Sequence, residues 1–134
     1  TRQGMYRYQE STDSFELVDV VGTPFVHSII EDRGRRLILS NFYQGLGIYD
    51  LATSSYRKGQ VAQNEAFTSF TMDSKGNIWG TTDGAGFARI DVSPDGTVEV
   101  THFNKENGLP SNSAGSISED AKTYLYRSKC VNLL

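Results

Sequence analysis

The chain has 134 residues, a formal net charge of −3 and 22% charged residues, with one cysteine, Cys130. The sequence is slightly acidic and has no stripe of basic residues of the kind that binds nucleic acids. No window is apolar over the ~18 residues that a membrane-spanning helix needs. A single cysteine cannot form a disulfide within the chain. We therefore expect one ordinary domain with no nucleic-acid partner and no membrane segment in this chain.

A stretch of 41 residues repeats along the chain without a gap, shown by the spacing of Gly4, Gly45 and Gly86. Residues 28–32 return as 69–73, and a third copy begins at Gly86 and gains about six residues around 107–112 before it reaches 116–120. Repeats of this length are typical of solenoids, arrays and propellers, because one unit cannot bury its own apolar face.

The strands predicted in chain order begin with a pair at residues 4–9 and 15–20. Two units of four strands follow, over 25–61 and 66–103, and a last pair is expected at 114–118 and 124–128. The middle unit shows why: apolar and polar residues alternate along 66–72, and turns with glycine or proline stand at 73–77, 83–86 and 93–96. Four antiparallel strands per ~40–45 residues is the pattern of a β-propeller blade.

Two segments carry a resemblance to a known family. DSKGNIWGTTDGAGF at residues 73–87, continuing as FARID at 87–91, and NKENGLPSNS at 104–113 resemble the core and the inter-blade segment of the two-component regulator propeller repeat. The resemblance implies the extracytoplasmic, periplasmic sensor region of a bacterial hybrid two-component histidine kinase, a protein of signal transduction that often senses carbohydrates. Kinase and receiver segments would follow in a full-length member, and they are not present here.

The predicted fold class is therefore all-β: a partial β-propeller of about three blades over residues 1–134, with two complete blades and two half-blades. Its parts are strands C and D of a first blade at 4–24, full blades at 25–65 and 66–113, and strands A and B of a last, irregular blade at 114–134. Propellers close with roughly 4–8 blades. The chain is thus expected to be a fragment of a larger ring, or to form a homodimer in which two copies complete each other through their end blades.

Residues 121–134 keep the register of the repeat but lose its turn residues, as either a truncated or frame-shifted end or a divergent terminal blade would. Asp32, Asp73 and Asp120 recur where the first strand of a unit ends, and capping of the following turn is the expected role. Trp79 is expected to pack within a blade.

The candidate ligand face is the one that carries the loops between the second and third strands and between successive blades. These loops are longer and rich in amides, with two adjacent aromatic residues, so they suit an oligosaccharide or another polar small ligand. The alternative is that the aromatic pair packs between blades. The candidate residues are Phe42, Tyr43, Gln44, Asn64, Asp83 and Asn104.

The predicted function is a non-catalytic, ligand-sensing propeller fragment of a two-component sensor, with a glycan as the candidate ligand. The alternative is a structural or protein-interaction blade array that self-associates to complete a propeller. No enzyme activity, cofactor or metal site is expected, because the loops hold only scattered acids and neither histidine has a second ligand at metal-binding spacing.

Overall fold

The structure is a computed structural model, and it describes residues 5–18, 26–41, 45–59, 67–82, 84–109, 111, 114–119 and 124–128. Its elements are β1 (Met5–Gln9), β2 (Ser14–Val18), β3 (Val26–Glu31), β4 (Arg36–Asn41), β5 (Gly45–Asp50), β6 (Ser55–Lys58), β7 (Phe67–Met72), β8 (Ile78–Thr82), β9 (Phe87–Val92), β10 (Val98–Phe103), the 3-10 turn η1 (Lys105–Asn107), β11 (Ala114–Glu119) and β12 (Tyr124–Ser128). The predicted all-β class is confirmed.

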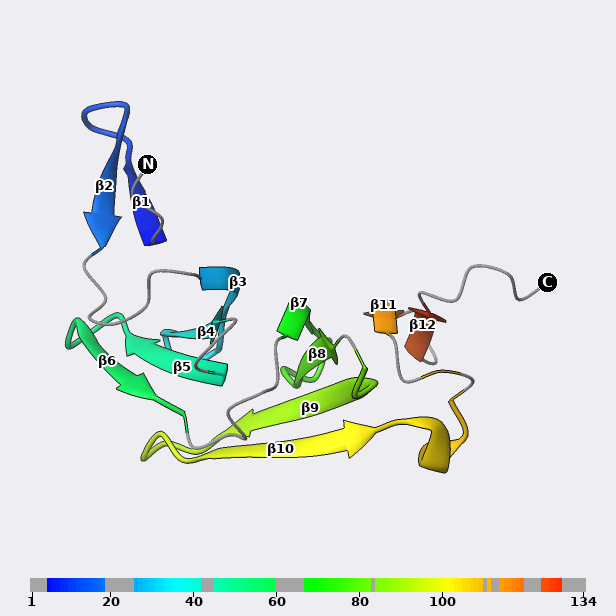
Figure 1. Cartoon of the computed structure of the whole chain (residues 1–134). Coiled ribbons are helices and arrows are strands. Elements are labelled where there is room, and N and C mark those ends of the chain that lie inside the picture. The colour runs from blue at the N-terminus through cyan, green and yellow to red at the C-terminus, as the bar shows by residue number, and fades with distance from the viewer. Residues whose placement is uncertain are drawn as a thin grey trace.

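The strands form four antiparallel sheets that follow one another in chain order along an open arc (Figure 1). Strands β3–β6 and β7–β10 are two four-stranded meanders, and the pairs β1–β2 and β11–β12 stand at the two ends. Strand β7 lies beside β3 and β11, so the first strands of successive sheets share the concave side of the arc. The last strands, such as β10, lie on the outer edge.

Each of the three first strands has an irregular register at the same place. The shift falls between Val26 and Ser28 in β3, between Phe67 and Ser69 in β7, and between Ala114 and Ser116 in β11. An extra residue of this kind bends the strand and increases its twist. The repeat therefore reproduces a local backbone irregularity as well as strand lengths.

Apolar side chains are buried between successive sheets, in two clusters. The larger joins the two four-stranded sheets, and its buried members are Ile38, Leu46, Ile48, Phe67, Ile78, Ala88 and Ile90. The smaller joins β1–β2 to the first four-stranded sheet through Met5, Leu39 and Tyr49. Each sheet is thus stabilised mainly by its neighbours, as expected for a repeat that cannot bury its own faces.

The capping role predicted for the repeated aspartates is confirmed at two positions. Asp32 Oδ1 accepts hydrogen bonds from the backbone N–H groups of Gly34 and Arg36 at 2.8 and 2.9 Å. Asp73 Oδ1 does the same for Lys75 and Asn77 at 3.0 and 2.8 Å. Asp120, the third such residue, lies outside the described residues.

Trp79 is half-buried within its blade, as predicted, and its ring stands 5.7 Å from that of Phe103. It also makes a contact that the sequence did not suggest: its indole Nε1–H donates to Asp73 Oδ2 at 3.0 Å. The carboxylate of Asp73 therefore ties the turn after β7 to the second strand of the same sheet.

Candidate functional site

The predicted ligand residues lie almost entirely outside the part of the chain that the structure describes. Phe42, Tyr43, Gln44, Asn64 and Asp83 all fall there, so their placement stays a prediction. Asn104 is described, and it follows directly on the last residue of β10.

Asn104 caps the short 3-10 turn η1. Its side-chain oxygen accepts a hydrogen bond from the backbone N–H of Glu106 at 2.9 Å, and its own backbone N–H donates to Asn107 Oδ1 at 3.1 Å. Gly108 closes the turn in the left-handed conformation, with φ of 94°. The amide oxygen of Asn104 therefore holds the loop that follows β10.

The loop that contains Asp83 is anchored beside Asn104. Thr82 donates its hydroxyl to the carbonyl of Gly86 at 2.8 Å and accepts from the N–H of Ala85 at 3.0 Å. Gly86 has φ of 80°, and a Cβ there would overlap the carbonyl of Phe103. Glycine at this position therefore allows the segment after β8 to lie against the end of β10.

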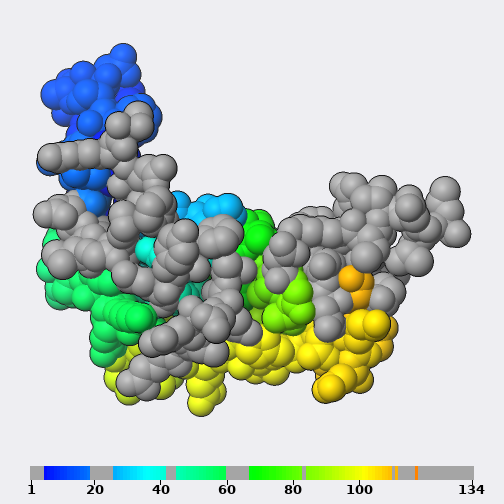
Figure 2. Space-filling model, viewed as in Figure 1, coloured from blue at the N-terminus to red at the C-terminus, as the bar shows by residue number. Residues whose placement is uncertain are grey.

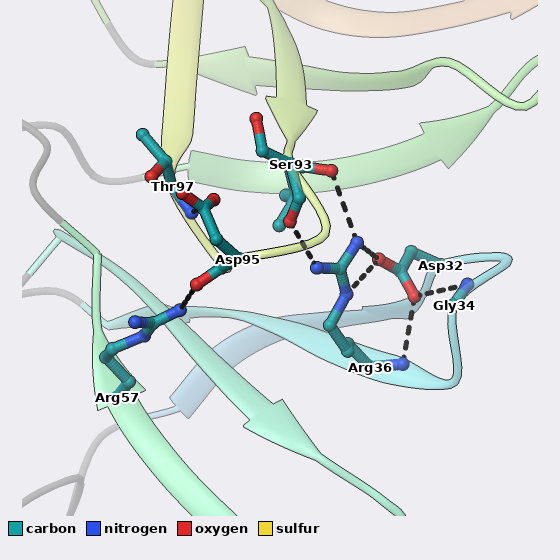
Figure 3. A network of polar contacts seen from close by, with 8 residues as sticks. Asp32, Gly34, Arg36, Arg57, Ser93, Asp95 and Thr97 are labelled. Carbon is teal, nitrogen blue, oxygen red and sulfur yellow. Dashed lines mark hydrogen bonds and ion pairs between the residues drawn. The ribbon is translucent and has the colours of Figure 1, made fainter.

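The opposite end of the sheets carries the tight turns, and three arginines donate there from the first four-stranded sheet to the second. Figure 3 shows two of them, Arg36 and Arg57. Arg36 donates through Nη1 to the carbonyl of Ser93 at 2.6 Å and through Nη2 to that of Val92 at 3.2 Å. Its Nε also donates to Asp32 Oδ2 at 2.8 Å, and the two side chains are only 15% and 9% exposed. We call this set of arginine contacts the arginine seam.

The other two arginines of the seam rest against glycines. Arg33 donates through Nη2 to the carbonyl of Ser74 at 2.9 Å, and a Cβ on Gly76 would lie 2.8 Å from its Nε. Arg57 donates to the carbonyl of Asp95, and a Cβ on the neighbouring Gly96 would overlap its guanidinium. These contacts confirm that the first and third turns of each sheet lie at the same end.

A pocket of about 260 Å³ opens at the seam between the two sheets. Its walls include Asp32, Arg33, Arg36 and Ile90. The guanidinium of Arg36 is already bound to one carboxylate and two carbonyls, which leaves it little capacity for a ligand. The polar groups of this pocket therefore serve to hold the two sheets together. Among the described residues, no group of three or more His, Cys, Asp or Glu side chains could hold a metal.

The arginine seam was not predicted from the sequence. A signal was available in the repeat itself. The first complete copy has Arg33 and Arg36 where the second has Ser74 and Asn77, 41 residues later. An arginine that is present in one copy and absent from the next indicates a contact that is made at only one of the interfaces between sheets.

Two carboxylates at this end, the half-buried Asp50 and the exposed Asp95, should make stability depend on pH. The backbone N–H groups of Thr53 and Ala52 hold the pKa of Asp50 below its usual value, and the N–H of Thr97 does the same for Asp95. A lowered folded-state pKa adds stability above the unfolded value of about 3.9, and that stability is lost as the pH falls through the folded pKa. We expect the urea midpoint to fall as the pH drops below about 4.

The measurement is the urea midpoint of the chain and of Asp50→Asn across this pH range. Asparagine keeps an acceptor oxygen for Ala52 and Thr53 but does not titrate, so the variant should lose less stability on acidification. Equal losses in the two proteins would contradict the role given to Asp50.

Comparison with known proteins supports the fold. A scan of family models and a search of curated proteins find no match. Among solved structures, the chain is similar to the extracellular domain of BT4673 from B. thetaiotaomicron, proposed to be a one component system, with a TM-score of 0.71, 20% identity, and coverage of 96% of this chain and 18% of that one. A second structure of that domain, proposed there to be a hybrid two component system, gives a TM-score of 0.67 at 21% identity over 90% of this chain and 17% of the other.

A third similar structure is PorZ, a bacterial surface component of the type-IX secretion system of Porphyromonas gingivalis, with a TM-score of 0.64, 16% identity, and coverage of 90% and 20%. The chain thus spans about a fifth of the length of each structure. The first two of these structures are extracellular domains, and the likeness to them, at 20% and 21% identity, shows that this chain shares their fold. Within the described ranges, no helix is long and apolar enough to span a membrane.

Proposed function

We propose that this chain is part of a β-propeller in the extracytoplasmic sensor region of a two-component signalling protein, where it contributes to binding a polar ligand and catalyses no reaction. The observation that carries the proposal is the likeness of 96% of the chain to the extracellular domain of BT4673. The resemblance of residues 73–91 and 104–113 to the two-component regulator repeat points to the same class independently.

The blade arrangement is supported by how the sheets are built. Two four-stranded antiparallel meanders stand side by side with their first strands inward, which is the relation of neighbouring propeller blades. The pairs β1–β2 and β11–β12 then correspond to the outer half of one blade and the inner half of another.

The ligand is proposed to be an oligosaccharide or a similar polar molecule, bound at the end of the sheets that carries the anchored loops. Thr82 and Gly86 fix one of these loops beside the capped turn at Asn104. Amide groups in such loops match sugar hydroxyls, and aromatic rings such as those of Phe42 and Tyr43 can stack on the apolar face of a sugar.

The test is a screen of oligosaccharides against the purified chain by calorimetry, followed by substitution of the loop. Phe42→Ala, Tyr43→Ala and Gln44→Ala should each weaken binding about tenfold, the factor that corresponds to ~1.4 kcal/mol. Gln9→Ala removes an amide at the opposite end of a sheet and should leave the affinity unchanged. Equal losses in all four variants would argue against this loop, and turnover of the oligosaccharide would contradict the non-catalytic role.

The second candidate function is a structural or protein-interaction blade array, which the likeness to PorZ, a secretion-system surface component, favours. Such an array would bind no small ligand through Phe42 or Tyr43. A chain that captures a protein from the cell envelope but gives no heat with any oligosaccharide would support this candidate over the sensor.

A further inference from the structure

Asn107 and Gly108, at the end of the turn η1 that follows β10, form the one Asn-Gly pair in the sequence. Both residues are exposed, and this part of the chain lies at the surface of the molecule (Figure 2). Gly108 has φ of 94°, and a Cβ built on it would meet no atom of the described residues within 4 Å. The peptide bond between the two residues is therefore accessible to solvent.

An asparagine that precedes a glycine can lose ammonia without an enzyme. The backbone nitrogen of the glycine attacks the side-chain Cγ of the asparagine, and the new N–Cγ bond closes a succinimide ring. The bond from Cγ to Nδ2 breaks, and the proton of the backbone N–H leaves with this nitrogen as ammonia. Water then opens the ring at either carbonyl and gives aspartate or isoaspartate. Glycine favours the attack because it has no Cβ to obstruct the approach.

The cap of η1 keeps both reacting groups away from this reaction. Asn107 Oδ1 accepts a hydrogen bond from the backbone N–H of Asn104 at 3.1 Å, which directs the side-chain amide toward the start of the turn. The attacking nitrogen, that of Gly108, donates its N–H to the carbonyl of Lys105 at 3.1 Å. Closure of the ring therefore requires that the turn opens first.

The turn η1 should open readily, because it packs little of its surface against the rest of the molecule. It has 3 residues, none of them buried, and its backbone hydrogen bonds join residues within 104–109. Segments of this kind open locally at a low cost in free energy. Asn77 is held more firmly, since its Nδ2 donates to Asp73 Oδ2 at 2.9 Å. It also precedes the buried, β-branched Ile78, whose side chain obstructs the attack.

We propose that Asn107 is a site of spontaneous deamidation and that the cap at Asn104 sets its rate. The aspartate product keeps a side-chain oxygen that can accept from the N–H of Asn104, so it preserves the turn. The isoaspartate product adds a methylene group to the backbone before Gly108. It therefore moves the N–H groups of Gly108 and Leu109 away from the two carbonyls that they contact at 3.1 and 3.2 Å. Formation of isoaspartate thus releases the loop after β10, whether or not the chain senses a ligand.

Peptide mapping by mass spectrometry tests the site, after the purified chain has been incubated at mildly alkaline pH. The peptide that contains Asn107 should show the mass change of replacing NH2 by OH well before the peptide that contains Asn77. Chromatography separates its isoaspartate form from its aspartate form. Asn107→Gln should abolish the change in this peptide, because a glutamine does not form the succinimide ring. Equal rates at Asn107 and Asn77 would overturn the proposal.

The role of the cap is tested by the rate of the same reaction. Asn104→Ala removes the side-chain acceptor for the N–H of Glu106, so it should raise the rate about fivefold, the factor that corresponds to ~1 kcal/mol for a lost cap. Thr101→Ala, which changes an exposed residue of β10, should leave the rate unchanged. The chain unfolded in guanidinium chloride should react faster still. No acceleration in Asn104→Ala, or equal rates in the folded and unfolded chains, would contradict the control by the cap.

Discussion

Phe67→Ala should lower the free energy of unfolding by about 3–5 kcal/mol, the range for truncating a buried aromatic side chain. Phe67 is fully buried in the cluster that joins the two four-stranded sheets. Its backbone is fixed as well, because Ser40 Oγ donates to its carbonyl at 2.9 Å and accepts from its N–H at 3.1 Å. Because these hydrogen bonds hold the strand in place, neighbouring side chains cannot move in to fill the space that the ring leaves. Urea unfolding followed by circular dichroism measures the loss.

The repeat supplies a compensating variant for this prediction. The ring of Phe67 occupies the space over Gly80, where a Cβ would overlap it. The preceding copy has Val26 and Leu39 at the corresponding positions, both packed in one cluster. Phe67→Val and Gly80→Leu should each destabilise the chain alone, and together they should recover much of the loss. A double variant as unstable as the sum of the singles would show that the two positions are not coupled.

Arg36→Ala should cost about 3 kcal/mol, the lower end of the range for removing one partner of a buried ion pair. The change leaves the carboxylate of Asp32, whose side chain is 9% exposed, with backbone partners only. It also removes both hydrogen bonds to the carbonyls of Ser93 and Val92 in the second sheet. The free energy of unfolding in urea measures the sum of the two effects.

Arg36→Asn separates these effects. Asn77 stands at the equivalent place of the second copy, and its Nδ2 donates to Asp73 Oδ2 at 2.9 Å. The asparagine variant should therefore keep the turn and lose only the contacts between sheets, at a cost of about half that of alanine. Stability equal to the parent chain would mean that the carbonyl contacts contribute nothing, and stability equal to Arg36→Ala would mean that they contribute everything.

Local patterns in the sequence were enough to predict the strands and their pairing. Period-two alternation and turns such as 73–77 and 93–96 determine where strands begin and end, so the structure places β7–β10 within a few residues of the prediction. The cap at Asn104 was also readable, because an asparagine before a short turn that ends at Gly108 is a typical cap. Asn104 was predicted to be a ligand residue because of its amide group, and its local capping role was not predicted.

Contacts between sheets were harder to predict, because they depend on which turns meet in space. Nothing local marks Arg36 as a partner of Ser93, 57 residues away. Gly80 is a second example. The motif around Trp79 marks it as typical of the repeat, but the reason that a glycine is needed there is the ring of Phe67, on another strand, which occupies the space of a Cβ. Such constraints emerge only once the sheets are packed.

The arginine seam has a consequence for how the two sheets can evolve. Its acceptors in the second sheet are backbone carbonyls, which every residue possesses, so substitutions in the turns at 74 and 92–95 cannot delete them. The donors are side chains, and one mutation at Arg33, Arg36 or Arg57 removes a contact outright. Substitutions should therefore be tolerated more readily in the second sheet than at the three arginines of the first. Gly76 and Gly96 are the exceptions in the second sheet, because a side chain at either position would collide with a guanidinium.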